Sequence, residues 1–186
     1  MKSWNLFLTV AAAMLFVASA ADAQQSACSL LTPSDIEVAT GAKAGAGDPS
    51  DYSIPVSPTK SEPVRACSWD VGTRQSHLVI SIIGRLSADV SAVAAAEAAA
   101  KNMAKQSVGK DMDTLRAKHW TVEEKDFGNG WCLTLTPPAS EKGLMLSSCT
   151  AGVKGMILTF TFTSPTKKLS IAQTKALLDQ AIGRLR

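Results

Sequence analysis

Hydroxyl-bearing residues recur at alternate positions in the second half of the chain. Side chains at alternate positions of a strand lie on one face of a sheet, so this spacing predicts a polar face that contacts a ligand or a partner protein. Threonine is also common on any half-solvated strand, which is the simpler interpretation of the pattern. The candidate ligand-binding residues are Thr134, Thr136, Ser147, Thr159 and Thr161, together with Trp120, whose ring can stack on a sugar or a peptide.

Acidic residues indicate a second kind of chemistry. Glu124 and Asp126 occupy alternate positions of an expected strand, so their carboxylates would share a face and could form an acid–base pair or bind a cation. Lys125 lies between them and can neutralise them. The two histidines, His77 and His119, stand near expected strand starts, and no G-x-S-x-G motif accompanies them. We therefore expect no catalytic residues, no metal site and no cofactor.

The first 23 residues contain the three parts of a secretory signal peptide. Lys2 supplies positive charge, residues 6–20 form an apolar stretch, and Ala21 and Ala23 are the small residues that precede a cleavage site. We therefore expect a mature chain that begins at Gln24 and a periplasmic or secreted bacterial protein. No later stretch is long and apolar enough to cross a bilayer. The net charge of +3 is spread along the chain, so no nucleic-acid partner is expected.

The chain contains four cysteines, all after the expected leader. In an exported protein this number predicts two disulfides, and no C-x-x-C motif of a zinc or thioredoxin-like site is present. Three pairings are available. A hairpin register that opposes Cys132 with Cys149 leaves Cys28 to pair with Cys67. A lipid on Cys28 is disfavoured, because Gln25 stands where lipoprotein signals carry a large aliphatic residue.

We expect a single domain over residues 24–186, and the sequence carries helix signals at three places in it. Thr32 suits the N-cap of a short helix, and Gly41 suits the left-handed residue that ends it. An alanine-rich helix is expected over residues 88–106 because alanine has the highest helix propensity. A further amphipathic helix is expected over residues 169–183.

Strand signals predict an antiparallel sheet of about five to six strands, with a meander in the C-terminal half. Residues 42–63 are rich in glycine, proline, serine and aspartate, so we expect an irregular loop there, with one short strand around residues 52–56. The remaining strands are expected at residues 64–71, 76–84, 119–127, 131–136, 144–149 and 156–162.

The spacing of the meander strands predicts how they pair. One hairpin register places Cys132 opposite Cys149. An odd-length turn centred on Val153 then places Leu146 opposite Phe160. In this arrangement the apolar residues of the last three strands share one face, and the hydroxyl residues share the other face.

Two short motifs carry a resemblance to a known group of proteins. The segment from Cys28 to Ile36 reads C-x-L-L-T-x-x-D-I, and Cys67 and Trp69 form a later C-x-W. With these motifs the chain resembles small secreted bacterial proteins of unknown function that open C-x-L-L-T-x-x-[DE]-[IV]. The resemblance implies a PsbP-like fold, which is an antiparallel sheet with helices packed against it, and it implies no catalytic residues.

These observations together predict an exported, non-enzymatic domain that binds a protein partner or a small ligand in the bacterial envelope. Two alternatives belong to other classes. One is an envelope hydrolase that uses the acidic residues, and the other is a redox or metal protein, which requires free thiols.

Overall fold

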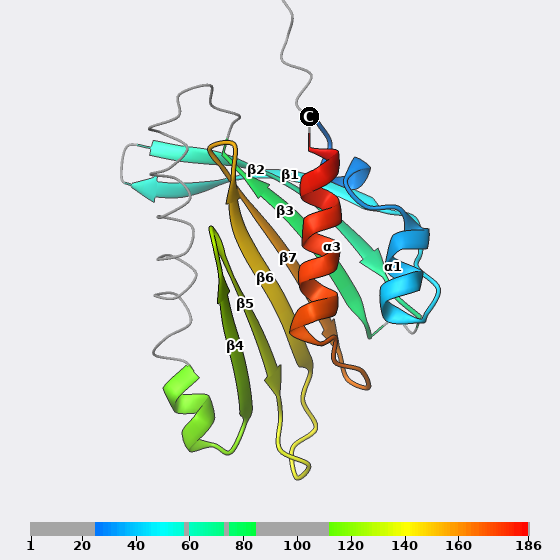
Figure 1. The fold of residues 1–186 in the computed structure, drawn as a ribbon, viewed down its shortest axis with the longest axis vertical. Helices are drawn as coiled ribbons and strands as arrows, with labels where there is room; N and C mark the ends of the chain where they lie inside the picture. Colours follow the sequence, from blue (N-terminus) through cyan, green and yellow to red (C-terminus); the bar gives the residue numbers. More distant parts are fainter. Residues whose placement is uncertain (1–24, 58–59, 73–74, 85–111, 186) are drawn as a thin grey trace, which may run out of the picture.

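A seven-stranded antiparallel sheet forms the centre of the fold, and helices pack against it (Figure 1). The computed structural model describes residues 25–57, 60–72, 75–84 and 112–185. The expected leader and the expected alanine-rich helix lie outside these residues. The fold class is α+β, as the sequence predicts, but the sheet contains more strands than predicted.

The strands pair in the order β1-β2-β3-β7-β6-β5-β4. β4 to β7 form the predicted meander, and the pairing of β3 with β7 joins this meander to the three N-terminal strands. β1 and β4 are therefore the two edges of the sheet. The strand bounds are Asp48–Ser57 (β1), Lys60–Asp70 (β2), His77–Ile83 (β3), Thr121–Phe127 (β4), Gly130–Thr136 (β5), Met145–Val153 (β6) and Met156–Ser164 (β7).

Edge strand β1 lies where the sequence predicts an irregular loop. It pairs along β2 and contains Pro49 and Pro55. Proline lacks the N–H that a central strand donates, but an edge strand has one side of its backbone outside any ladder and tolerates it. The short strand predicted around residues 52–56 is therefore present as part of β1, but the loop prediction is wrong for the rest of residues 48–57, because an edge strand tolerates this proline-rich composition.

The β6–β7 hairpin also differs from the sequence prediction. It closes with a two-residue turn at Lys154 and Gly155, whose φ angles of 50° and 80° are both left-handed, as a tight hairpin turn requires. Phe160 therefore pairs with Cys149 rather than with Leu146. Because the registers differ by an odd number of residues, the side chains of β7 lie on the opposite face from the one predicted.

Short helix α1 (Pro33–Thr40) follows the 3-10 turn η1 (Ala27–Ser29). The hydroxyl oxygen of Thr32 accepts a hydrogen bond from the backbone N–H of Asp35, and the carboxylate of Asp35 accepts one from the backbone N–H of Thr32. This reciprocal capping box satisfies two N–H groups that a helix start leaves unpaired. Gly41 ends the helix with a left-handed φ of 66°. Both helix boundaries are those that the sequence predicts.

Helix α3 (Ile171–Arg184) begins with a second capping box, formed by Ser170 and Gln173. It packs across β5, β6 and β7 on the same side of the sheet as α1 (Figure 1). Residues 112–117 form a further helical segment before β4. The sequence prediction for α3 is confirmed, since its bounds differ by at most two residues.

The main hydrophobic core lies between the sheet and the helices α1 and α3. A smaller cluster on the opposite face is formed by Met112, Trp131 and Leu133. The fully buried large side chains of the main core include Trp69, Leu78, Ile80, Phe160 and Phe162. The sheet therefore has one face that is deeply buried beneath α3 and a second face with a separate cluster.

Both predicted disulfides are present. Cys28 of η1 bonds to Cys67 of β2, and Cys132 of β5 bonds to Cys149, which lies directly opposite on β6. The predicted β5–β6 register is therefore confirmed. All four cysteines are paired, so the redox and metal alternatives have no free thiol to use. Two disulfides are consistent with an oxidising extracellular compartment.

A methyl group added at Gly47 would lie 2.7 Å from Cys67 Sγ and 2.9 Å from Trp69 Nε1. We expect Gly47→Ala to lower the free energy of unfolding by about 1–3 kcal/mol, because overpacking forces neighbouring groups to shift. Gly45→Ala is the matched control, since its methyl group would approach nothing closer than the Asp70 carbonyl at 3.6 Å. Urea unfolding measures both changes. Equal effects of the two substitutions would contradict this prediction.

Candidate ligand-binding pocket

A pocket opens at one end of the sheet, where β5 and β6 part. The ladder between these strands ends at Leu135, opposite Leu146. Beyond that pair, Thr136 still pairs with β4 and Met145 still pairs with β7, so the two strands diverge. We call this opening, together with the connecting loop of residues 137–144, the β5–β6 fork.

Two consecutive prolines explain why the strands part here. Pro137 and Pro138 follow the last residue of β5. Proline has no N–H to donate to a ladder and is excluded from central strands. The ladder therefore cannot continue into the loop, and the fork stays open.

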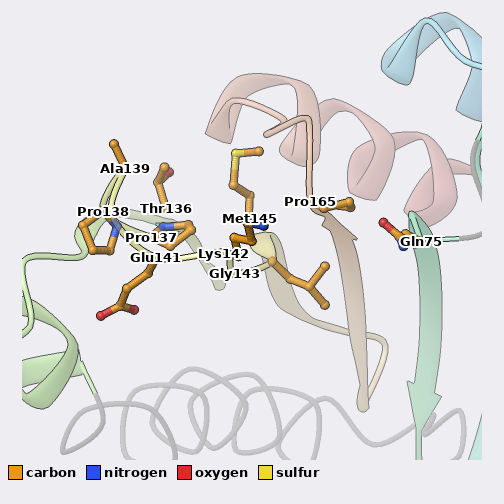
Figure 2. A pocket seen from close by; sticks show the side chains of 11 residues that line it. Gln75, Thr136, Pro137, Pro138, Ala139, Glu141, Lys142, Gly143, Met145 and Pro165 are labelled. Carbon is orange, nitrogen blue, oxygen red and sulfur yellow. The ribbon is translucent and has the colours of Figure 1, made fainter.

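The pocket in the β5–β6 fork has a volume of about 630 Å³, which is within the range of ligand-binding sites. Figure 2 shows side chains of the loop on one side, Pro165 and Gln75 on the other, and Met145 between them. Pro165 directly follows β7, and Gln75 stands just before β3. Four strands thus contribute their ends to one site.

Thr136 stands at this pocket, and its hydroxyl has no hydrogen-bond partner among the described residues. Thr136 lines the pocket, and its Oγ1 atom is one of three buried side-chain polar atoms that form no hydrogen bond in the described part of the chain. A threonine hydroxyl often bonds to the backbone N–H two residues further on. Here the next residues are Pro137 and Pro138, and neither has an N–H. The hydroxyl is therefore buried without the local donor that usually satisfies it.

Ser164, at the end of β7, shows the effect of a single following proline. Pro165 comes next, but the two residues after it retain their N–H groups. Ser164 Oγ accepts hydrogen bonds from the backbone N–H groups of Thr166 and Lys167, both at 3.2 Å. The contrast indicates that the second proline after Thr136 removes the donor two residues further on, which Thr166 supplies to Ser164.

Trp120 braces the loop of the β5–β6 fork. Its indole N–H donates a hydrogen bond to Oε2 of Glu141 at 3.1 Å. The ring also lies against the loop, since a methyl group at Gly143 would be 3.4 Å from it. Glu141 in turn lines the pocket. Trp120 therefore positions an acidic residue of the pocket wall.

Charges of both signs stand side by side in the pocket wall. Glu141 and Lys142 are consecutive and exposed, and within the described residues Lys142 has no ion-pair partner. Gln75 adds an amide, which both donates and accepts hydrogen bonds. Leu144, whose side chain is 49% exposed, and Met145 contribute apolar surface. The pocket thus combines apolar walls with donors and acceptors, and its two formal charges cancel.

Two of the predicted ligand-binding hydroxyls are buried beneath α3. Thr134 and Ser147 are 1% and 0% exposed. Ser147 Oγ donates to the carbonyl of Leu169 at 2.8 Å and accepts from its N–H at 3.1 Å. Thr134 Oγ1 donates to the carboxylate of Glu123 at 3.3 Å, and Lys168, hydrogen-bonded to the same carboxylate, holds its pKa below the usual value. Both hydroxyls are therefore engaged in the fold.

Thr159 and Thr161 lie on the opposite face of the sheet from Thr134. Their hydroxyl groups bond across the β6–β7 ladder, Thr161 to Ser148 at 3.0 Å and Thr159 to Thr150 at 3.1 Å. The predicted single hydroxyl face is therefore wrong, because the observed register of β7 separates these residues. Of the predicted ligand-binding residues, the structure brings only Thr136 and Trp120 to the fork.

Neither the acidic candidates Glu124 and Asp126 nor the two histidines line the pocket. Glu124 and Asp126 share a face of β4, as predicted, and Glu124 bonds to Arg116 at 2.8 Å. His77 Nδ1 lies 2.8 Å from a carboxylate oxygen of Asp70. Within the described residues, no group of three or more histidine, cysteine or acidic side chains is arranged to hold a metal ion.

Replacing the Thr136 hydroxyl with a methyl group tests whether it has a structural role. We expect Thr136→Val to leave the free energy of unfolding unchanged or raise it by up to about 1 kcal/mol. The substitution removes a buried hydroxyl that has no partner, and with it the desolvation penalty of that group. Thr174→Val is the matched control, since the Thr174 hydroxyl donates to the Ser170 carbonyl at 2.9 Å and its loss costs about 1 kcal/mol. Urea unfolding compares the two. An equal loss in both variants would give Thr136 a structural role.

Sequence reasoning identified Thr136 from its strand position but missed the other polar residues of the pocket, Gln75, Glu141 and Lys142. The sequence did contain one signal for the place of the pocket. This signal is the Thr-Pro-Pro run that begins at Thr136, which predicts both the end of a strand and a hydroxyl without its usual local donor. Gln75 carries no such signal, because only the pairing of β3 with β7 brings it to the pocket.

In the described part of the chain, no helix has the length and apolar character to span a membrane.

Comparison with known proteins identifies no family for this chain. No protein-family model matches the chain, and no curated protein is significantly similar to it in sequence.

Proposed function

We propose that this chain is an exported, non-enzymatic domain of the bacterial envelope that binds a ligand or a partner protein in the β5–β6 fork. The observation that carries this proposal is the hydroxyl of Thr136, a pocket-lining residue: the hydroxyl is buried and has no hydrogen-bond partner in the described part of the chain. Buried polar groups in native proteins are rarely left unpaired, so an orphan at a pocket indicates a bound partner.

Export is supported by two independent features. The N-terminal residues have the composition of a signal peptide, and the two disulfides suit an oxidising compartment. Cleavage after Ala23 would leave Gln24 as the first residue. Gln25 is already held by the fold, since its side chain donates to the Arg184 carbonyl at 2.8 Å.

Binding rather than catalysis is supported by the groups that line the fork. A nucleophilic mechanism needs a hydroxyl or thiol beside a general base. Thr136 and Glu141 line the pocket, but the carboxylate of Glu141 is engaged by the Trp120 indole. The ring of His77, which is not part of the lining, contacts the carboxylate of Asp70. The apolar residues Leu144 and Met145 instead provide the surface that a binding site needs.

Photo-crosslinking tests this function in the producing cells. We would place benzoylphenylalanine at Leu144 in the full chain, and at Val38 as the control, because Val38 is 85% exposed on α1 and does not line the pocket. We expect an adduct of defined mass from position 144 only, and its loss in the Thr136→Val background. No adduct at position 144, or equal adducts at both positions, would contradict the proposal.

A further inference from the structure

We infer that the occupant of the β5–β6 fork is an extended peptide segment of a partner protein that carries a neutral, apolar side chain. This inference rests on the proposed function and names the class of ligand. It follows from the charge balance of the pocket, from its apolar residues and from the way in which the two strands separate.

The charge balance excludes strong selection for an ion. Glu141 and Lys142 are neighbours in the pocket wall and have opposite charge. An anionic ligand would be attracted to the ammonium of Lys142 but repelled by the adjacent carboxylate of Glu141. A cationic ligand would be attracted to Glu141 but repelled by Lys142. A neutral ligand with both donors and acceptors can use the two groups together. Peptide groups have this property, since each carries one N–H and one C=O.

The hydrogen-bonding groups of the fork match a peptide backbone. Thr136 carries a buried hydroxyl that can donate or accept once a ligand displaces what covers it, and Gln75 carries an amide that can do both. These two residues lie on different sides of the pocket, as Figure 2 shows. A ligand that satisfies both must carry polar groups along its length, which favours a chain of peptide units over a compact molecule with a single polar end.

The apolar residues provide an anchor for one side chain of such a peptide. Leu144 is 49% exposed at the pocket, and Met145 lies beside it, with Pro137 and Pro165 in the same wall. A large apolar side chain that remains this exposed gains most when a partner covers it. Methionine adapts its shape to different partners, which suits recognition of a side chain.

The separation of β5 and β6 provides a place for an extended backbone. At Thr136, β5 has a partner only in β4, and at Met145, β6 has a partner only in β7. Thr136 and Met145 therefore lack a ladder between them, which leaves one such residue at the end of each strand. An extended peptide commonly binds by lying along an unpaired strand edge, with alternate side chains entering a pocket.

Selection from a phage-displayed library of random linear peptides tests the inference directly. The mature full-length chain would be immobilised with its disulfides intact. We expect enriched peptides that share one apolar residue flanked by uncharged residues. Binding of a selected peptide, measured by fluorescence anisotropy, should weaken about tenfold in Leu144→Asp and in Thr136→Val, and stay unchanged in the control Val38→Asp.

Two further measurements distinguish the ligand classes. Lys142→Gln should change peptide affinity by no more than about threefold, because an exposed charge contributes little to binding a neutral segment. Enriched peptides that bind Leu144→Asp as well as the unaltered chain would overturn the inference, as would an empty selection. If native mass spectrometry then showed a small-molecule adduct that Thr136→Val removes, the proposed function would stand and the peptide inference alone would fail.

Discussion

Removing the Cys28–Cys67 disulfide with the double substitution Cys28→Ala and Cys67→Ala is expected to lower the free energy of unfolding by about 4 kcal/mol. The bridge spans 39 residues of sequence and ties η1, and with it α1, to strand β2. By loop-entropy theory, a cross-link over this distance restricts the unfolded chain strongly. Urea unfolding of the oxidised chain and of the variant measures the loss.

The second bridge provides the matched comparison. Cys132 and Cys149 are separated by 17 residues and lie directly opposite in the β5–β6 ladder. Because the closed loop is shorter, Cys132→Ala with Cys149→Ala should cost about 3 kcal/mol. A larger loss from this pair than from the Cys28–Cys67 pair would show that native packing, rather than loop closure, governs the contribution of the bridges.

Asp35→Asn is expected to lower the free energy of unfolding by about 2–4 kcal/mol, because this carboxylate has several partners at once. It caps α1 through the backbone N–H of Thr32 and forms a forked ion pair with Arg184 of α3. Gln180 donates a further hydrogen bond to it at 2.5 Å. Asp35 is thus the main polar link between α1 and α3.

The same carboxylate predicts how stability depends on pH. The guanidinium of Arg184, and next the hydrogen bonds from Thr32, hold the pKa of Asp35 well below its usual value. A lowered folded pKa contributes stability that is complete above the unfolded pKa of about 3.9 and is lost as the pH falls below it. Unfolding free energies measured from about pH 6 down to about pH 2 should therefore fall less steeply in Asp35→Asn than in the unaltered chain.

Asp179→Asn is the control for both measurements. Asp179 pairs with Lys175 at 2.6 Å on the exposed surface of α3, four residues apart. Exposed pairs of this kind contribute about 0.5 kcal/mol or less. If Asp35→Asn had an effect as small as this control, or left the acid limb of the stability curve unaltered, the link between α1 and α3 would be of no energetic importance.

Local signals in the sequence predicted several elements correctly. Thr32 and Gly41 predicted both ends of α1, because a capping residue and a left-handed glycine act on their immediate neighbours. The opposition of Cys132 and Cys149 was also predicted, since the observed register places them in one pair of the ladder. These features depend on few residues, and their physical effect does not need the rest of the fold.

Predictions that required knowledge of a turn or of a covering element failed. The β6–β7 register depends on the left-handed φ angles of Lys154 and Gly155, which set a two-residue turn instead of the expected odd-length one. Strand β1 was predicted only as a short strand around residues 52–56 within a loop, because its prolines argue against a central strand, whereas an edge strand tolerates them. Neither the turn conformation nor the edge position can be read from composition.

For the candidate site, the sequence by itself determined that Thr136 precedes two prolines and so has neither a continuing strand nor the usual local donor for its hydroxyl. Only the tertiary structure decided that Thr136 lines a pocket, because β7 and β3 bring Pro165 and Gln75 to the same end of the sheet. It also decided that Thr134 is buried, because α3 covers that face. Burial depends on which element packs against a strand, and this is a property of the whole chain.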